Sequence, residues 1–193
     1  MNKFELLKKD FLENLSKNQK ELLQKICFYS NCLCNFLFRN EKYLDYFYEN
    51  LDKPLLGREN LVNEALKLLD LENENEFVLN LTCFKMKHFG RIVSKDIYSK
   101  HPLPELMEEY SYLADATLEA AFKRAWETAE KRYGKPLDDS NNPVKASVIG
   151  LGKLGGTELN YYSDIDIMYI YQSEGRLKRV IQTENFLLTC LLK

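Results

Sequence analysis

The sequence predicts an α+β protein, with a mainly helical N-terminal lobe followed by the start of a small sheet. Apolar residues recur every three or four positions through about residue 134, which is the period of an amphipathic helix. Residues 134–143 then collect glycine, proline, asparagine and aspartate, which are typical of loops. Two apolar runs of strand length, 144–151 and 164–171, follow this loop. We therefore expect a helical region over residues 1–134, a linker over 135–143 and an incomplete second lobe over 144–193.

The helical period predicts helices over residues 4–15, 22–37, 61–71, 77–98 and 104–132. The last would span about 43 Å, long enough to connect a helical core rigidly to the sheet. Segment 77–98 also carries four basic residues, which either form a solvated face or face a phosphate or an acidic site. They are Lys85, Lys87, Arg91 and Lys95. His88 lies in the same segment, and we expect its side chain to be exposed or hydrogen-bonded rather than catalytic.

The composition indicates a globular protein of the cytoplasm. The chain is 45% hydrophobic and 29% charged, with a net charge of −2 and an isoelectric point near 5.8. This balance argues against a nucleic-acid surface, which would be basic. Residues 1–25 contain no uninterrupted apolar run, so we expect neither a secretory signal nor a membrane span. The five cysteines are expected to be reduced thiols.

The strongest chemical signal is a pair of carboxylates two positions apart, Asp164 and Asp166. In an extended strand these side chains project from the same face, with Cα atoms about 6.6 Å apart, while Ile165 and Ile167 point into a core. Oxygen ligands in such an arrangement suit Mg²⁺, and two ions can be shared between them. An isolated Asp-x-Asp motif is most often a solvated pair of side chains, but the glycine turn between two apolar runs favours a metal site here.

Residues of the turn before the aspartates are candidates for phosphate binding. Gly155 and Gly156 lack Cβ atoms, so their backbone N–H groups can approach a phosphate closely. Ser163 can donate its hydroxyl to the same group. For Lys153 two interpretations stay open, because it can approach the nucleotide or simply be a solvated charge.

At these residues the chain resembles a known family. The run from Gly150 to Ile167, GLGKLGGTELNYYSDIDI, resembles the signature of the glutamine synthetase adenylyltransferases, which belong to the DNA polymerase β-like nucleotidyltransferase superfamily. Residues 84–87, 91–97 and 113–116 resemble the helical region before that signature. The resemblance therefore covers about residues 80–171, and it implies that residues 144–193 begin a polymerase β-like catalytic lobe.

The resemblance also implies an activity and a set of roles. Enzymes of this family attach AMP from ATP to a tyrosine of glutamine synthetase, or remove it by phosphorolysis to give ADP. Asp164 and Asp166 would be the catalytic metal ligands for two Mg²⁺ ions. The phosphates of the nucleotide would be held by Gly155, Gly156, Ser163 and Lys153. The implied partners are glutamine synthetase and a PII-type signalling protein, with no nucleic acid and no membrane.

One departure from the family pattern limits the expected activity. The superfamily completes its metal site with a third carboxylate, placed in this family within an Arg-x-Asp-x-Arg-Leu-Arg-Pro segment, and no such segment occurs here. We therefore expect an N-terminal fragment that is inactive alone. The early position of the motif and its Glu-Leu-Asn favour the AMP-removing half of the family, although both directions stay open. The alternative function is a non-catalytic helical fragment that binds glutamine synthetase or a nitrogen-signalling protein.

Overall fold

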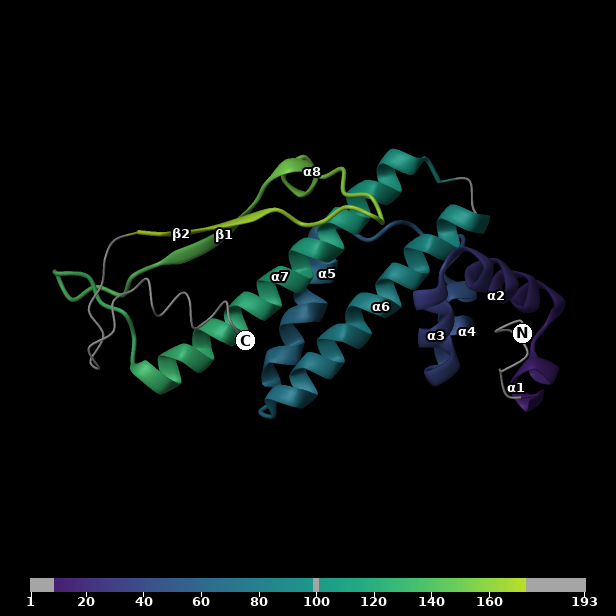
Figure 1. The fold of residues 1–193 in the computed structure, drawn as a ribbon, viewed down its shortest axis with the longest axis horizontal. Helices are drawn as coiled ribbons and strands as arrows, with labels where there is room; N and C mark the ends of the chain where they lie inside the picture. Colours follow the sequence, from purple (N-terminus) through teal and green to yellow (C-terminus); the bar gives the residue numbers. More distant parts are fainter. Residues whose placement is uncertain (1–8, 99–100, 173–193) are drawn as a thin grey trace.

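The computed structural model describes residues 9–98 and 101–172, and it confirms an α+β arrangement that is mainly helical (Figure 1). A helical lobe comes first in the chain, and a two-stranded hairpin lies along its longest helix. The helices of the lobe are α1 (Lys9–Asn14), α2 (Lys17–Tyr29), α3 (Asn31–Arg39), α4 (Lys42–Glu49), α5 (Arg58–Leu66), the 3₁₀ helix η2 (Lys67–Asp70), α6 (Glu74–Tyr98) and α7 (Leu103–Tyr133). The hairpin consists of β1 (Ala146–Gly150), α8 (Gly152–Gly155) and β2 (Ile167–Tyr171).

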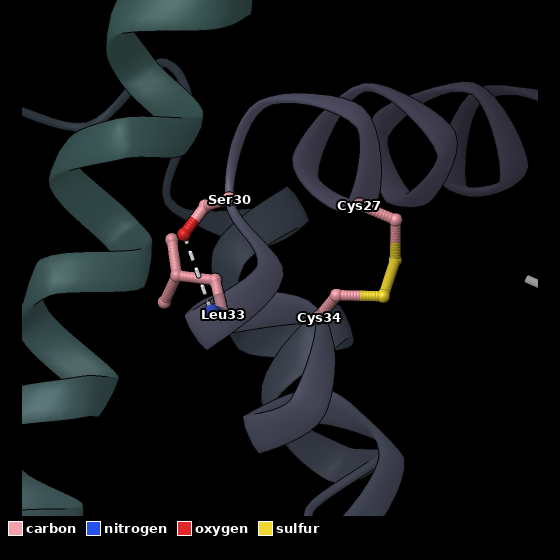
Figure 2. The surroundings of a disulfide bond; sticks show 4 residues. All are labelled: Cys27, Ser30, Leu33 and Cys34. Atoms are coloured by element: carbon pink, nitrogen blue, oxygen red, sulfur yellow. Dashed lines mark hydrogen bonds between the residues drawn. A yellow bond between two sulfur atoms is a disulfide. The ribbon is translucent and has the colours of Figure 1, made fainter. Parts of the chain in front are cut away.

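The helical period over residues 22–37 is interrupted at Ser30, which divides the segment into α2 and α3. The backbone N–H of Ser30 donates to the carbonyl of Ile26 at 2.8 Å, ending α2. Its side-chain oxygen accepts a hydrogen bond from the backbone N–H of Leu33 at 3.2 Å, which caps the start of α3 (Figure 2). One serine therefore ends one helix and begins the next, and the chain changes direction there.

This change of direction brings Cys27 and Cys34 together in a disulfide bond (Figure 2). Their Cα atoms are 4.6 Å apart. The prediction of reduced thiols is therefore wrong for these two residues, because Ser30 reverses the chain between them. Cys32 and Cys83 are free, and Cys190 lies outside the described residues.

Reduction of this disulfide is expected to lower the free energy of unfolding by about 2–3 kcal/mol, because the unfolded chain regains the freedom of the closed loop. Urea unfolding followed by circular dichroism, with and without a phosphine reductant, measures the difference. The Cys27→Ala/Cys34→Ala variant is the control and should not respond to the reductant. Alkylation of both cysteines in the folded chain without reductant would contradict the bond.

Two apolar cores meet on the two sides of α6 (Figure 1). One core joins α2, α3 and α4 to α6, and the other joins α5, α6 and α7. Gly90 allows the close approach of α4, since a Cβ at this position would lie 2.1 Å from the Cζ atom of Phe47. The helices predicted over 77–98 and 104–132 are confirmed as α6 and α7.

The two strands form an antiparallel sheet with Ala146 opposite Tyr171 and Gly150 opposite Ile167. Both strands are shorter than predicted, and β2 starts three residues later than expected. Alternate side chains are half-buried, and Tyr169 of β2 lies 6.1 Å from Phe122 of α7 between ring centroids. The sheet therefore packs on α7, which positions the long connection between its strands.

Candidate functional site

The candidate site is the connection between β1 and β2, which contains α8, the glycine pair and the two aspartates (Figure 1). Two buried leucines of this connection, Leu154 and Leu159, pack with Ala114 of α7. The backbone N–H of Leu159 also donates to the buried hydroxyl of Ser111 at 2.9 Å. Helix α7 therefore holds the connection in place by both apolar and polar contacts.

The glycines have distinct structural roles in the turn. Gly152 has a φ of +54°, a left-handed conformation that favours glycine. A Cβ on Gly155 would lie 2.6 Å from the backbone oxygen of Gly150, whereas a Cβ on Gly156 would meet nothing closer than 3.4 Å. The N–H groups of Gly155 and Gly156 donate to the carbonyls of Leu151 and Gly152, respectively. Both amides are thus used within the turn, and phosphate binding by these glycines stays a prediction.

The Gly155→Ala variant is expected to be destabilised by about 1–3 kcal/mol, because backbone atoms of β1 must move to accommodate the methyl group. Gly156→Ala is the matched control in the same turn, and we expect little change because the contacts there are ordinary. Chemical unfolding of both variants measures the difference. Equal stability of the two variants would contradict the tight packing of α8 on β1.

Asp164 and Asp166 lie in the segment that leads into β2, and both are exposed to solvent. The backbone oxygen of Asp166 accepts a hydrogen bond from Leu151 at 2.8 Å. Its Oδ2 atom would lie 3.4 Å from a Cβ built on Gly152, so this carboxylate reaches the start of α8. The expectation that Ile165 points into a core is wrong: 40% of it is exposed, because it precedes the strand that packs on α7. Ile167 is half-buried against the Leu154 and Leu159 cluster.

Lys153 and Ser163 are brought together beside the aspartates. The Nζ atom of Lys153 donates to Oγ of Ser163 at 3.1 Å, and Ser163 in turn donates to Oδ1 of Asn160 at 2.8 Å. This chain of bonds ties α8 to the residue before Asp164. One exposed cation, a hydroxyl and two exposed carboxylates therefore gather in this turn.

The donor set has the chemistry of a Mg²⁺ site. Mg²⁺ is usually held by one or two protein carboxylates and completes its octahedral shell with water and phosphate oxygens. Over residues 9–98 and 101–172, no three His, Cys, Asp or Glu side chains gather in a metal-binding group. Metal ligation by Asp164 and Asp166 therefore stays a prediction, in which solvent and substrate would supply the remaining ligands.

Three of the four basic residues of α6 make ion pairs or hydrogen bonds inside the helical lobe, which neither a solvated face nor a phosphate-facing one predicted. Only Lys85 of the four is exposed. Arg91 donates to Glu109 in a pair that is almost completely buried. Lys95 is buried and donates to the backbone oxygens of Leu51 and Lys53. No pattern in the sequence indicates these contacts, because the partners are 18 to 44 residues away.

Lys87 and His88 share the carboxylate of Glu64. Lys87 Nζ and His88 Nε2 lie 2.8 and 3.1 Å from its two oxygens. The hydrogen bond from His88 is the largest cause that lowers the pKa of Glu64 to about 2. Burial lowers the pKa of His88 in turn. A neutral imidazole with its proton on Nε2 fits both facts, since Nδ1 is buried without a partner.

Acid is therefore expected to destabilise the lobe in two stages. Below about pH 6.5 the unfolded chain binds a proton at His88 that the folded chain resists, and between about pH 4.5 and 2 Glu64 contributes in the same direction. Stability should fall as the pH falls. The Glu64→Gln variant should be less stable than the parent at neutral pH, and its stability should fall less between about pH 4.5 and 2, where Glu64 no longer contributes. Urea midpoints over this pH range test this, and parallel curves for parent and variant would contradict it.

Comparisons with known proteins converge on one family. The family model described as glutamate-ammonia ligase adenylyltransferase matches residues 20–190. The chain is similar to bifunctional glutamine synthetase adenylyltransferase/adenylyl-removing enzymes of three bacteria. Identity is 30% in Shewanella woodyi, 29% in Pasteurella multocida and 30% in Haemophilus ducreyi, over 92%, 95% and 92% of this chain. The chain spans 19%, 20% and 20% of these relatives, about a fifth of their length. None of the helices in the described residues is both long and apolar enough to cross a membrane.

Proposed function

Because the chain belongs to the glutamate-ammonia ligase adenylyltransferase family, we propose that Asp164 and Asp166 support metal-dependent nucleotidyl transfer on a tyrosine of glutamine synthetase. The observation that carries the proposal is that two solvent-exposed carboxylates lie next to the Lys153–Ser163 pair at the start of α8. Carboxylates attract divalent cations, and the lysine attracts a phosphate. Both ligands of a nucleotide–metal complex therefore have complementary groups in one turn.

In the proposed direction, an oxygen of inorganic phosphate attacks the phosphorus of the tyrosine-linked AMP. The bond from phosphorus to the tyrosine oxygen breaks, and that oxygen takes up the proton that the attacking hydrogen phosphate loses, so that ADP and free tyrosine are released. Two Mg²⁺ ions, when bound, would neutralise the charge that develops on the phosphate oxygens. Asp164 and Asp166 would hold the ions. Lys153 and Ser163 would orient the phosphates, and the packing of Leu154 and Leu159 on α7 would keep these groups in place.

We expect the 193-residue chain alone to turn over poorly. Two exposed carboxylates leave most of the metal shell to water and substrate, so the affinity for Mg²⁺ should be weak. The activity is therefore best measured on the complete gene product. Its partners, as proposed, are glutamine synthetase and a PII-type signalling protein, and its place is the cytoplasm.

The direction of transfer can be measured with isotope-labelled phosphate. The complete gene product is incubated with Mg²⁺, labelled phosphate and glutamine synthetase that carries AMP. Removal by phosphorolysis predicts labelled ADP and a loss of AMP from the protein. Transfer of AMP from ATP to unmodified glutamine synthetase, with no labelled ADP in the first reaction, would show the opposite direction. If neither product forms, the proposal is contradicted.

The competing function is a non-catalytic helical module that binds glutamine synthetase or a nitrogen-signalling protein. The size of the helical lobe, with large exposed aromatic side chains on α2, favours it. This alternative predicts partner binding that is unchanged when both aspartates are replaced, together with no nucleotidyl transfer by the parent protein.

A further inference from the structure

The turn that leads to Asp164 is held by Asn160, a residue outside the proposed metal and phosphate ligands. The backbone oxygen of Asn160 accepts a hydrogen bond from the N–H of Ser163 at 3.2 Å. Its side-chain Oδ1 atom accepts two more, from the backbone N–H of Tyr162 at 3.1 Å and from the hydroxyl of Ser163 at 2.8 Å. Three hydrogen bonds to one residue therefore fix the chain immediately before the first aspartate.

Asn160 is itself attached to the helical lobe. The preceding residue, Leu159, is buried, and its backbone N–H donates to the buried hydroxyl of Ser111 on α7 at 2.9 Å. At the other end of the turn, the backbone oxygen of Lys153 accepts a hydrogen bond from the N–H of Glu158 at 2.9 Å. The main chain is thus fixed at both ends, and only the long, exposed lysine side chain depends on a further contact for its position.

The direction of each hydrogen bond in this turn follows from the groups at the two ends of the chain of bonds. A backbone N–H can only donate, so the Asn160 atom that meets Tyr162 is the amide oxygen. This oxygen can only accept, so the single hydroxyl proton of Ser163 points to Asn160. The ammonium of Lys153 can only donate, and it donates to a lone pair of Ser163 Oγ at 3.1 Å. While these bonds hold, Ser163 has no proton left for a phosphate.

The ammonium of Lys153, in contrast, keeps donors for an anion. It carries three N–H groups, of which Ser163 takes one, so two remain for the oxygens of a phosphate. A lysine side chain is flexible, and ordering it when a ligand binds lowers the affinity. The contact with Ser163 restrains the side chain before the phosphate arrives, which removes part of that cost.

We infer that Asn160 is a positioning residue for the proposed reaction, and that it acts through Ser163 on Lys153. The inference rests on the proposed function, because it assumes that Lys153 binds the phosphates. Asn160 holds the hydroxyl of Ser163 in the orientation that accepts from the lysine. Ser163 in turn holds the ammonium beside the two aspartates. In this arrangement Ser163 contributes to phosphate binding by orienting the lysine rather than by donating to the phosphate itself.

A direct and an indirect role of Ser163 predict different effects of the Asn160→Ala variant. If Asn160 positions Ser163, its loss should raise KM for phosphate of the complete gene product about two- to tenfold, the usual contribution of one hydrogen bond, with little change in kcat. A Ser163 that donated directly to phosphate would instead gain a free proton in this variant. KM for phosphate would then be unchanged or lower, and that result would overturn the inference.

A second set of variants separates positioning from a merely structural role. Ser163→Ala should raise KM for phosphate as much as Asn160→Ala, and both changes together should raise it no further, because they act on the same lysine. Ser163→Thr keeps the hydroxyl and should restore a KM close to that of the parent. Tyr162→Phe removes an exposed hydroxyl from the same turn and is the matched control, with no change expected. Effects that multiply in the double variant would overturn the inference.

Protection of Lys153 gives a measurement that does not require catalysis. Acetylation by an N-hydroxysuccinimide ester is followed by peptide mass spectrometry in the presence of Mg²⁺ and ADP, with exposed Lys145, at the opposite end of β1 from α8, as internal reference. ADP should slow acetylation of Lys153, and half-protection should need about two- to tenfold more ADP in Asn160→Ala and Ser163→Ala. Equal ADP requirements in parent and variants, or no protection in the parent, would overturn the inference. No nucleotidyl transfer by a parent protein that shows the expected protection would instead contradict the proposed function alone.

Discussion

Replacing Asp164 or Asp166 by asparagine is expected to lower nucleotidyl transfer by the complete gene product at least about 100-fold. Asparagine keeps the size of the side chain but removes the negative charge that attracts Mg²⁺. Metal stabilisation of a phosphoryl transition state is worth several kcal/mol, and about 1.4 kcal/mol corresponds to a factor of ten in rate. Formation of labelled ADP under saturating phosphate measures the effect. Binding to glutamine synthetase should be retained, since both side chains are exposed and away from the apolar cores.

Glu158→Gln is the matched control for these variants. Glu158 is an exposed acidic residue of the same turn, but it is not among the proposed metal ligands. Its replacement removes the same unit of charge and should change the rate little. A similar loss of rate in all three variants would show that general electrostatics of the turn, rather than metal ligation by the two aspartates, explains the effect. Full activity of both aspartate variants would eliminate the catalytic proposal.

The Glu109→Ala variant is expected to lose about 3–5 kcal/mol of folding free energy, the largest effect on stability that we predict. Arg91 and Glu109 are each only 1% exposed, and Glu109 also accepts a hydrogen bond from the backbone N–H of Leu56 at 2.7 Å. Removal of the carboxylate leaves the charge of Arg91 and a backbone donor without their partner. Because Glu109 lies on α7 two residues before Ser111, the loss should also loosen the hold on Leu159.

Urea unfolding at neutral pH tests this, with Glu21→Ala as control. Glu21 forms an exposed pair with Lys25 on α2, so its replacement should hardly move the unfolding midpoint. A Glu109→Ala variant as stable as the Glu21→Ala variant would contradict the importance of the buried pair. Replacing Arg91 and Glu109 together by apolar residues of similar size should restore much of the stability, because no charge is then left buried without a partner.

The sequence was most informative where partners are close along the chain. The period of apolar residues was sufficient for α6 and α7, because each forms its own backbone hydrogen bonds and buries one face. Reversals of chain direction were harder to predict from the sequence. A helical pattern continues through Ser30, and only the capping bonds of this serine show that two helices meet there and bring Cys27 to Cys34. Pairing of the buried Arg91 was equally unpredictable, since it depends on how α6 and α7 cross.

The same distinction applies to the candidate site. Lys153, Ser163 and the aspartates lie within 14 residues of one another, so a short motif could indicate their proximity, and the structure does bring Lys153 to Ser163. The attachment of the turn between them could not be predicted, because Leu159 donates to Ser111 of α7, which is 48 residues away. The exposure of Ile165 was likewise missed, because the start of β2 depends on where α7 covers the sheet.

Mn²⁺ binding by the 193-residue chain, followed by electron paramagnetic resonance in the presence of ADP, tests metal ligation by Asp164 and Asp166 without requiring turnover. Mn²⁺ accepts the same oxygen ligands as Mg²⁺, and the signal of the free ion decreases when it is bound. We expect the chain to bind more Mn²⁺–ADP than its Asp164→Asn/Asp166→Asn variant, which should leave the signal close to that of Mn²⁺ and ADP alone. Equal binding by the parent chain and the double variant would show that these two aspartates are not the metal ligands.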